Sequence, residues 1–262
     1  MIETHPDRAR RQPARHRRSR AARGAGIACP LARGTGGHQV RFASLALAIG
    51  AAFTATAAVA ATNWLTVVDT AGGGHRIGNP AAKVKLTEFI SYTCTHCGEF
   101  AREGTNAVDV YVASGKVQLD VRHIVRDPVD LTAAMLANCG PAAKFPRNHA
   151  TLMLSQPKWL PIMSRATAGQ KARWSTGAGP ARRRAIASDL GFYDLMVPRG
   201  YDRPTLDRCL SDEALATRLA EQTAADAKKW GVRGTPSFAI DGTLLAGTGT
   251  WPMLQPQIDA RL

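Results

Sequence analysis

Two cysteines, Cys94 and Cys97, are separated by two residues and form a C-x-x-C motif. Thiols at this spacing can cycle between a dithiol and a disulfide. The apolar stretch 84–90 before the motif predicts a strand, and apolar residues recur at helical spacing after it until Gly115. The motif is therefore expected where a strand passes into a helix, with Cys94 near the helix N-terminus.

The predicted position favours a reactive first cysteine. Free backbone N–H groups and the helix dipole stabilise a thiolate more than a thiol. An ordinary thiol has a pKa of about 8.5, whereas C-x-x-C thiols reach roughly 3.5 to 7.5. His96, between the two cysteines, can add a positive charge or a hydrogen bond. We therefore predict an oxidising disulfide, in which exposed Cys94 exchanges with substrate and Cys97 resolves the mixed disulfide.

A C-x-x-C pair is also half of a tetrahedral zinc site, and this is the main alternative. Such a site needs a second ligand pair at short spacing, but the sequence has no second C-x-x-C and no H-x-x-x-H. The other cysteines, Cys29, Cys139 and Cys209, are isolated from one another. We predict no metal and no dissociable cofactor, because the disulfide itself carries the electrons.

A second motif, Gly234-Thr235-Pro236, comes late in the chain and directly precedes a predicted strand at 237–240. The early C-x-x-C, the long helical stretch after it and the late Gly-Thr-Pro together resemble a DsbA-like member of the thioredoxin superfamily. The resemblance covers roughly residues 63–262. It implies an α/β, thioredoxin-like fold with a helical insertion.

The resemblance also implies how the second motif works. In that family the proline is cis and lies against the two cysteines, and the backbone of the residue before it pairs with substrate. For this chain it implies a cis bond between Thr235 and Pro236 and a substrate-binding role for both.

The resemblance assigns a third position to Glu88, six residues before Cys94. A buried acid in the family's matching stretch implies that Glu88 moves protons to and from Cys97. Burying an acid in an apolar strand is costly unless its pKa rises or it finds a partner. The alternative is an acid that points to solvent, since Lys85 and Thr87 show that the strand is not uniformly apolar.

The chain departs from the best-known members of this family at Thr95 and Thr235, where they carry a proline and an aliphatic residue. A threonine at the second position of the motif is common in isomerase and reductase relatives. We predict an oxidase that introduces disulfides into exported proteins. The alternatives are an isomerase or reductase of the same fold, or a non-enzymatic metal-binding or chaperone protein. The expected partners are cysteine-containing exported proteins and a membrane oxidase linked to quinone, and the expected state is a monomer.

The anchors above predict a coarse domain map. Residues 61–129 and 211–262 form the thioredoxin-like domain, and residues 130–210 form the helical insertion, with an irregular stretch at 157–180. His75, His123 and His149 have no spacing that suggests a site and are interpreted as structural. The predicted elements of the first domain are strands at 66–68, 84–90, 117–125, 237–240 and 243–245, and helices at 212–230 and 253–262.

Residues 42–60 form an uncharged apolar run that ends in Ala58-Val59-Ala60, a small-x-small cleavage pattern. This run predicts a signal peptide and a periplasmic protein. Because the run is 19 residues long, an uncleaved membrane anchor is the alternative.

The segment before this run does not fit a normal signal peptide. Residues 1–41 hold ten arginines against Glu3 and Asp7, which gives +8 of the chain's +14. An arginine-rich arm can bind nucleic acid through phosphates, but no aromatic residue precedes Phe42 to stack on bases. We predict no nucleic-acid partner and interpret residues 1–40 as the product of a start codon placed too early, with the true start at a codon such as that of Val40.

Without Cys29, four cysteines would remain, and in an exported protein that number suggests two pairs. Some DsbA-like proteins carry a structural disulfide across the helical insertion, which here implies a bond between Cys139 and Cys209. This bond would close a loop of 70 residues and stabilise the fold by roughly 4 kcal/mol. It requires Cα atoms about 4.4 to 6.8 Å apart. The alternative is two buried, unpaired cysteines.

Overall fold

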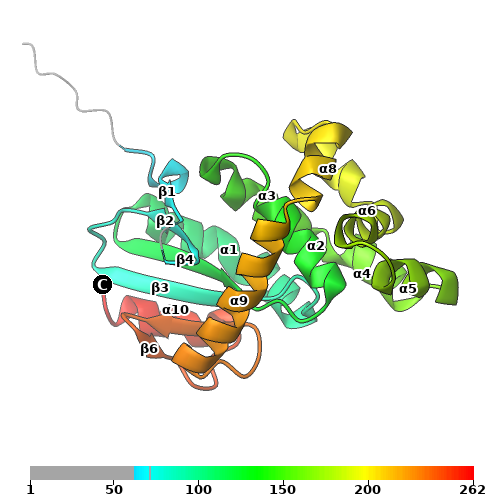
Figure 1. The fold of residues 1–262 in the computed structure, drawn as a ribbon. Helices are drawn as coiled ribbons and strands as arrows, with labels where there is room; N and C mark the ends of the chain where they lie inside the picture. Colours follow the sequence, from blue (N-terminus) through cyan, green and yellow to red (C-terminus); the bar gives the residue numbers. More distant parts are fainter. Residues whose placement is uncertain (1–61, 71) are drawn as a thin grey trace, which may run out of the picture. The chain divides into compact units, whose positions relative to one another are not determined.

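A six-stranded mixed sheet forms the centre of the protein, with helices on both faces (Figure 1). The computed structural model describes residues 62–70 and 72–262. The strand order is β1-β2-β4-β3-β5-β6, in which β3 and β4 are parallel and all other neighbours are antiparallel. The strands are β1 (Val68–Asp69), β2 (His75–Gly78), β3 (Val84–Ile90), β4 (Val117–His123), β5 (Ser237–Ile240) and β6 (Thr243–Leu244). The predicted α/β class is confirmed.

Alternation along β3 divides its side chains between the two faces of the sheet. Leu86 and Ile90 pack into the main core with Phe100 of α1 (Thr95–Ala113). Phe89 points the other way and packs against Trp230 of α9 (Glu213–Trp230), with ring centroids 5.4 Å apart. The helix α10 (Trp251–Asp259) lies beside α1 on the first face (Figure 1).

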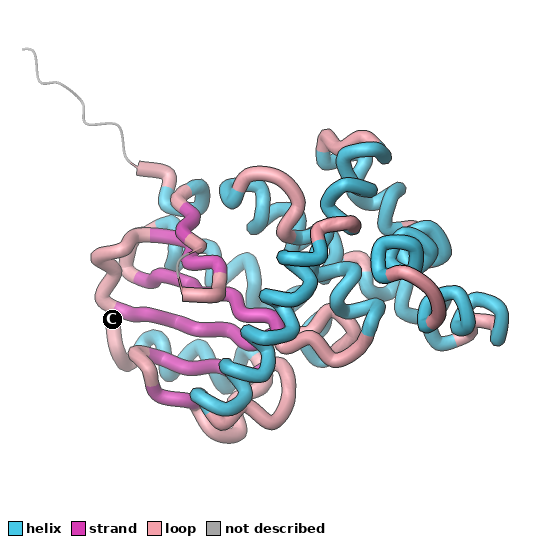
Figure 2. Tube along the Cα trace, viewed as in Figure 1, coloured by secondary structure: helices cyan, strands magenta, loops and turns pink. Residues whose placement is uncertain are grey.

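Between β4 and α9, residues 128–210 form helices without any strand (Figure 2). This stretch overlaps the predicted helical insertion. Its buried side chains join the main core of the sheet, and Trp159 meets Phe192 edge to face with ring centroids 5.2 Å apart. The helices are α2 (Pro128–Ala137), α3 (Phe145–Leu154), α4 (Gln156–Ser164), α5 (Ala168–Ser175), α6 (Gly179–Asp189), α7 (Phe192–Met196) and α8 (Arg203–Leu210). Short 3-10 turns lie at Trp64–Thr66, Ala142–Lys144 and Val197–Arg199.

The prediction of an irregular stretch at 157–180 is wrong, because these residues form most of α4, all of α5 and the start of α6. Pro157 and Pro180 occupy the first turns of α4 and α6, where a missing backbone N–H leaves no helical bond unmade. Thr167 and Gln170 form a capping box that starts α5. These two prolines therefore mark helix starts, whereas Pro161 lies inside α4.

Other boundaries also differ from the prediction. Residues 64–66 form a 3-10 turn, so the strand predicted at 66–68 is displaced to Val68–Asp69, and β2 was not predicted at all. The strand β4 ends at His123, and α10 starts two residues before its predicted start and ends at Asp259. The strands β1 and β2 have only two and four residues, too few for periodicity to identify them, and the ends of longer elements are fixed by hydrogen bonding that the sequence pattern does not show.

The N-terminal predictions fall on residues outside the described part of the chain. They are the apolar run 42–60 with its cleavage pattern, Cys29, and the arginine-rich extension 1–40. Within residues 62–70 and 72–262, none of the helices combines the length and the apolar character that a membrane span requires.

Candidate active site

The C-x-x-C motif lies at the predicted junction between β3 and α1. Cys94 is the residue before the first turn of α1, and its carbonyl accepts a hydrogen bond from the Gly98 N–H at 3.3 Å. Both cysteines are free thiols, with 6% of Cys94 and 1% of Cys97 exposed. Cys94 was predicted to be exposed, but the loop that carries Thr235 covers it. It is nevertheless the more accessible of the two.

The two thiols differ strongly in acidity. The pKa of Cys94 is lowered to about 5, mainly by a hydrogen bond from the Cys97 thiol, with further contributions from Thr235, the Cys97 backbone N–H and the charge of Arg126, against the effect of burial. The pKa of Cys97 is raised far above its ordinary value by burial, by its bond to Cys94 and by nearby charges that include Glu88. At neutral pH the reduced site therefore holds one thiolate and one thiol.

The imidazole of His96 does not bond to either sulfur. It is exposed, and its Nδ1 lies 2.8 Å from Oε2 of Glu99 on the next turn of α1. Glu99 and then the Cys94 thiolate raise the pKa of His96. The predicted influence of His96 on the thiolate is therefore limited to its charge.

Arg126 is a cation near Cys94 that the sequence reasoning missed. Its Nε donates to Ser91 Oγ at 2.8 Å, and its terminal nitrogen donates to Thr93 Oγ1 at 3.2 Å. The carboxyl ends of the parallel strands β3 and β4 meet at one edge of the sheet, so residues that follow them become neighbours. That topological rule was the available signal, since spacing in the sequence gives none.

The same edge supplies two carboxylates that hold the turn before Cys94. Asp130 accepts from the Tyr92 N–H at 2.8 Å and from Ser91 Oγ at 2.5 Å. Asp127 accepts from Thr93 Oγ1 at 2.6 Å and also caps α2 through the N–H groups of the first turn. Because Asp127 caps the helix, α2 starts at Pro128, two residues before the predicted start of the helical insertion.

The helical segment contacts the turn through Gln156, at the start of α4. Its Nε2 donates to the carbonyls of Tyr92 at 2.7 Å and Cys94 at 2.9 Å. Its Oε1 lies where a side chain at Gly98 would begin, 2.0 Å from an ideal Cβ position. Residue 98 must therefore lack a side chain for the amide to reach the turn. Sequence reasoning missed Gln156, because 62 residues separate it from Cys94.

The Thr235–Pro236 peptide bond is cis, and the Cys94 Sγ lies 3.0 Å from the Thr235 carbonyl oxygen. The second motif thus lies directly against the reactive sulfur. Two hollows adjoin the segments that meet at this contact. One, of about 360 Å³, lies beside Thr235 and Pro236. The other, of about 750 Å³, lies beside Thr93 and Thr95 and is lined by apolar side chains of α4.

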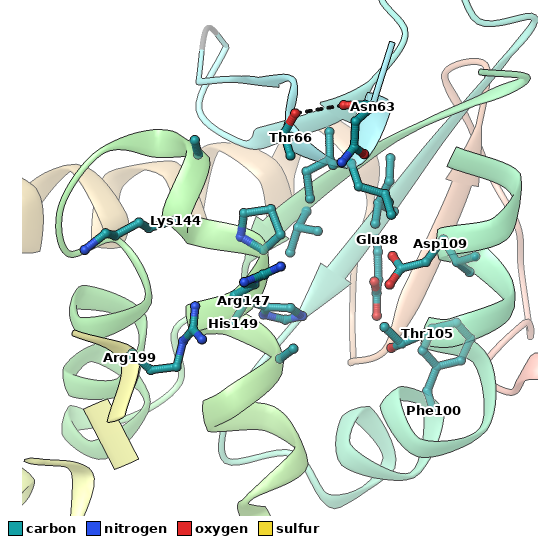
Figure 3. Close-up of a pocket in the computed structure, with 18 residues that line it drawn as sticks. Asn63, Thr66, Glu88, Phe100, Thr105, Asp109, Lys144, Arg147, His149 and Arg199 are labelled. Atoms are coloured by element: carbon teal, nitrogen blue, oxygen red, sulfur yellow. Dashed lines mark hydrogen bonds between the residues drawn. The ribbon is translucent and has the colours of Figure 1, made fainter. Parts of the chain in front are cut away.

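Glu88 is buried, with 8% of the residue exposed. Its pKa is raised to about 8, mainly by burial and then by the charge of Asp109. The alternative of a solvent-facing acid is excluded. Glu88 and Asp109 line a cavity of about 590 Å³ between α1, the sheet and α3 (Figure 3). On the opposite wall of this cavity lie Arg147 and His149.

The three histidines gather beside Tyr92. His149 Nδ1 lies 2.9 Å from the Tyr92 hydroxyl, and His75 stacks on Phe145 with centroids 3.5 Å apart. Burial lowers the pKa of His75 and of His149 to about 4, and that of His123 well below its ordinary value. Across the described residues, no three His, Cys, Asp or Glu side chains converge as metal ligands would.

Cys139 and Cys209 form a disulfide with Cα atoms 5.6 Å apart, inside the predicted range. Cys139 lies two residues beyond the end of α2, and Cys209 lies in α8. The Tyr201 hydroxyl donates a hydrogen bond to the Cys139 carbonyl at 2.6 Å, next to the disulfide. This disulfide joins the two ends of the helical segment.

A family model described as thioredoxin matches residues 70–260. A solved protein-disulfide isomerase from Novosphingobium aromaticivorans is similar to this chain, with 49% identity, a TM-score of 0.70, and coverage of 74% of this chain and 98% of that one. DsbA1 from Wolbachia pipientis shares the fold at 18% identity and a TM-score of 0.59, with 76% and 96% covered.

A relative from Rickettsia conorii, whose name assigns it provisionally to the protein-disulfide oxidoreductases, is 26% identical over 168 residues. The match covers 63% of this chain and 52% of the relative. The chain thus spans about half the length of the curated relatives it matches. The match to the thioredoxin family model extends over most of the chain. From this match the chain belongs to the thioredoxin family.

Proposed function

We propose that the protein is a thiol:disulfide oxidoreductase that exchanges the Cys94–Cys97 disulfide with pairs of cysteines in other proteins. The observation that carries the proposal is the difference in acidity between two adjacent thiols. The pKa of Cys94 is lowered to about 5, whereas burial keeps Cys97 protonated. The first sulfur is therefore a good leaving group and nucleophile, and the second can store a proton.

In the oxidising direction, a substrate thiolate attacks the Cys94 sulfur of the disulfide. The bond between the two protein sulfurs breaks, its electron pair goes to Cys97, and Cys97 takes up one proton. A second substrate thiolate then attacks the substrate sulfur of the mixed disulfide. Cys94 leaves as a thiolate, so the substrate has lost two electrons and the protein has gained them.

The oxidising direction follows from the same acidity. A stabilised thiolate favours the reduced protein, and for a two-electron couple each factor of ten in the equilibrium is worth about 30 mV. We assign the substrate backbone to Thr235 and Pro236, because the Thr235 carbonyl is 3.0 Å from the Cys94 sulfur and a hollow adjoins the pair. His96 contributes charge at the entrance, and Glu88 supplies the proton to Cys97.

A disulfide isomerase is the second candidate. The observation that favours it is the protein-disulfide isomerase from Novosphingobium aromaticivorans, which is 49% identical to this chain. Thr95 within the motif supports the same alternative. An isomerase would act on non-native disulfides and would need its own pair reduced, so its partner would have to reduce the pair rather than oxidise it.

We further propose a periplasmic setting, with exported proteins as substrates and a quinone-linked membrane oxidase as the partner that regenerates the disulfide. The thioredoxin-like domain in this assignment comprises residues 61–129 and 211–262, and residues 130–210 are its insertion. The contact of Gln156 with the turn at Cys94 supports a functional link between the two parts.

Equilibration with glutathione tests the direction. An oxidase is expected to be mostly reduced at the potential of a cytosolic glutathione pool, and a potential near the roughly −270 mV of thioredoxin would contradict oxidase function. Oxidation of reduced ribonuclease, compared with reactivation of scrambled ribonuclease, separates the oxidase from the isomerase.

Single cysteine variants test the roles of the sulfurs. Cys97→Ala is expected to accumulate mixed disulfides with substrate, because the resolving thiol is gone, and Cys94→Ala is expected to abolish exchange. The double variant Cys139→Ala with Cys209→Ala is the control and should keep exchange. Labelling of Cys97 before Cys94 by an alkylating reagent at pH 6 would contradict the assignment.

A further inference from the structure

A second acid lies beside Glu88 on the same side of the cavity (Figure 3). Asp109 lies on α1, one turn after Thr105, and Figure 3 shows the two carboxylates pointing toward each other with the Thr105 hydroxyl beside them. The sheet side of the cavity near Glu88 is apolar, with Leu119 and Val121. The polar surroundings of Glu88 are therefore concentrated on α1.

The two acids form no ion pair with the cations of the described residues. Among the ion pairs of the described residues, none includes Glu88 or Asp109. The other titratable or charged groups near Glu88 are Tyr92 and Cys97 at the turn, and His149, Arg147, Lys144 and Arg199 across the cavity. The imidazole of His149 is engaged with the Tyr92 hydroxyl, and the ammonium of Lys144 lies over the Tyr201 ring at 4.4 Å. Two facing carboxylates without a cation cannot both ionise readily.

Their different burial sets the order of ionisation. Glu88 is buried in the core, whereas Asp109 is only half-buried and lines the cavity closer to solvent. Burial also raises the pKa of Asp109, but that of Glu88 rises to about 8 because the Asp109 charge adds to its burial. Asp109 ionises first, and its negative charge then opposes loss of the proton from Glu88.

We propose that Asp109 is a positioning residue that holds a proton on Glu88 and connects Glu88 to solvent through the cavity. This inference rests on the proposed thiol exchange. The cavity, of about 590 Å³, has room for many water molecules, each of which occupies about 30 Å³ in the liquid. It is lined by polar groups that can bind them. Protons therefore have a route to Glu88 that does not cross the substrate surface.

The proton balance of the exchange defines the task of the pair. When the bond between Cys94 and Cys97 breaks, the electron pair stays on the Cys97 sulfur. Glu88 gives its proton to that sulfur and becomes a carboxylate beside Asp109. The repulsion between the two charges then draws a proton from solvent, and Glu88 is restored. Cys94 remains a thiolate, so one proton is taken up for each disulfide reduced.

Asp109→Asn tests the proposal through the pH dependence of disulfide reduction. The rate of reduction of the Cys94–Cys97 disulfide by dithiothreitol is measured from pH 5 to 9 by acid quenching and alkylation. The ratio of the variant rate to the wild-type rate removes the titration of the reductant. We expect this ratio to stay near one at pH 5 and to fall by about fivefold at pH 8, because Glu88 loses its proton at lower pH once the Asp109 charge is gone.

Two variants make the test specific. Glu103→Gln removes an exposed acid from the same helix and should leave the ratio near one at every pH. In a Glu88→Gln background, Asp109→Asn should have no further effect, because its influence passes through Glu88. A ratio for Asp109→Asn that follows the Glu103→Gln control, or an effect that persists without Glu88, would overturn the proposal.

Carbon-13 titration of the carboxyl groups in the reduced wild-type protein provides a readout that needs neither variant nor substrate. Coupled acids give two steps, and the Glu88 signal should show a second inflection where Asp109 ionises. A single Glu88 step would refute the pair even if Asp109→Asn did not fold. Absence of exchange with every thiol substrate would instead refute the proposed function, while leaving the coupled titration intact.

Discussion

The two faces of the central sheet both bury carboxylates, but they treat them in opposite ways. On the α9 face, Asp226 and Asp120 bind one arginine, Arg122, which lies in β4. On the α1 face, Glu88 lies beside another acid, Asp109, and no ion pair of the described residues includes it. The two clusters belong to neighbouring strands, since Glu88 and Arg122 lie on β3 and β4, which pair in parallel.

On the α9 face, Arg122 is close enough to form an ion pair with each carboxylate. Arg122 donates to Asp226 at 2.8 Å, to Asp120 at 2.9 Å and to the Gly72 carbonyl at 2.9 Å. Its guanidinium also lies 6.0 Å from the Trp230 ring. Burial raises the pKa of Asp120, and the charge of Arg122 opposes that rise. The guanidinium of Arg122 therefore has a carboxylate partner in β4 and another in α9.

Paired and unpaired buried charges have different consequences for a protein. A buried charge with a matched partner stabilises one arrangement, and removing the partner leaves the other charge desolvated and unpaired. A buried acid without a cation titrates near the pH at which the protein works, which is what a proton donor requires. We therefore expect the charges on the α9 face to stabilise the fold, and the acids on the α1 face to serve the proposed exchange.

The largest expected effect comes from breaking the paired cluster. Arg122→Ala should lower the free energy of unfolding by about 3–5 kcal/mol, because two buried carboxylates lose their partner. The pKa of Cys94 should stay near 5, since Arg122 is not among the groups that determine it. Urea unfolding and the thiolate absorbance of the folded protein measure the two quantities.

The double variant Arg122→Met with Asp226→Leu is the matched control for this prediction. It removes the charges of both partners and should recover part of the lost free energy, because no unpaired ion remains between those two positions. A single variant as stable as the wild type would show that water reaches the cluster, and the contrast between the two faces would fail.

The sequence predicted the elements that periodicity and local motifs define. The strand before Cys94, the helix after it and the strand after Pro236 form as predicted, because their signals lie within a few residues of one another. The cluster at Arg122 could not be predicted in this way. Its carboxylates come from β4 and from α9, and 104 residues separate Arg122 from Asp226.

The residues of the candidate site show the same difference between local and long-range signals. Glu88 and Thr235 were placed by a family resemblance, which carries long-range information that one sequence does not contain. Gln156, Asp109 and Arg126 were missed, because each acts on the site through a contact between distant segments. The order of the strands would have indicated Arg126, whereas only the fold of the helical segment places Gln156.

A smaller effect is expected from neutralising the unpaired face. Glu88 has a pKa of about 8 in the folded protein and 4.5 as its ordinary value. Between these two pH values the unfolded chain releases the Glu88 proton while the folded protein keeps it, so wild-type stability falls as pH rises through this window. Glu88→Gln removes this loss and should be more stable than the wild type by about 4 kcal/mol at pH 8.

The sign of this prediction distinguishes the two faces. The stability difference between Glu88→Gln and the wild type should grow from pH 4.5 to pH 8 and then level off, as measured by urea unfolding at each pH. Exchange should become slower in the same variant. A Glu88→Gln protein that is less stable at pH 8 than at pH 5, relative to the wild type, would mean that Glu88 is paired after all.

The smallest expected effect concerns the one cation that contributes to the acidity of Cys94. Arg126 is tied to Ser91 and Thr93 and acts on the sulfur by charge alone, as the last of the causes that lower the pKa. Arg126→Ala should raise the pKa of Cys94 from about 5 by roughly 0.5, and make the disulfide less oxidising by about 15 mV.

Arg126→Lys is the control for this prediction, because it should keep most of the charge and stay close to the wild type. Thiolate absorbance as a function of pH, together with the glutathione equilibrium, measures both changes. If Arg126→Lys and Arg126→Ala shifted the pKa equally, the hydrogen bonds to Ser91 and Thr93 would be responsible, and the contribution of this face would be positional rather than electrostatic.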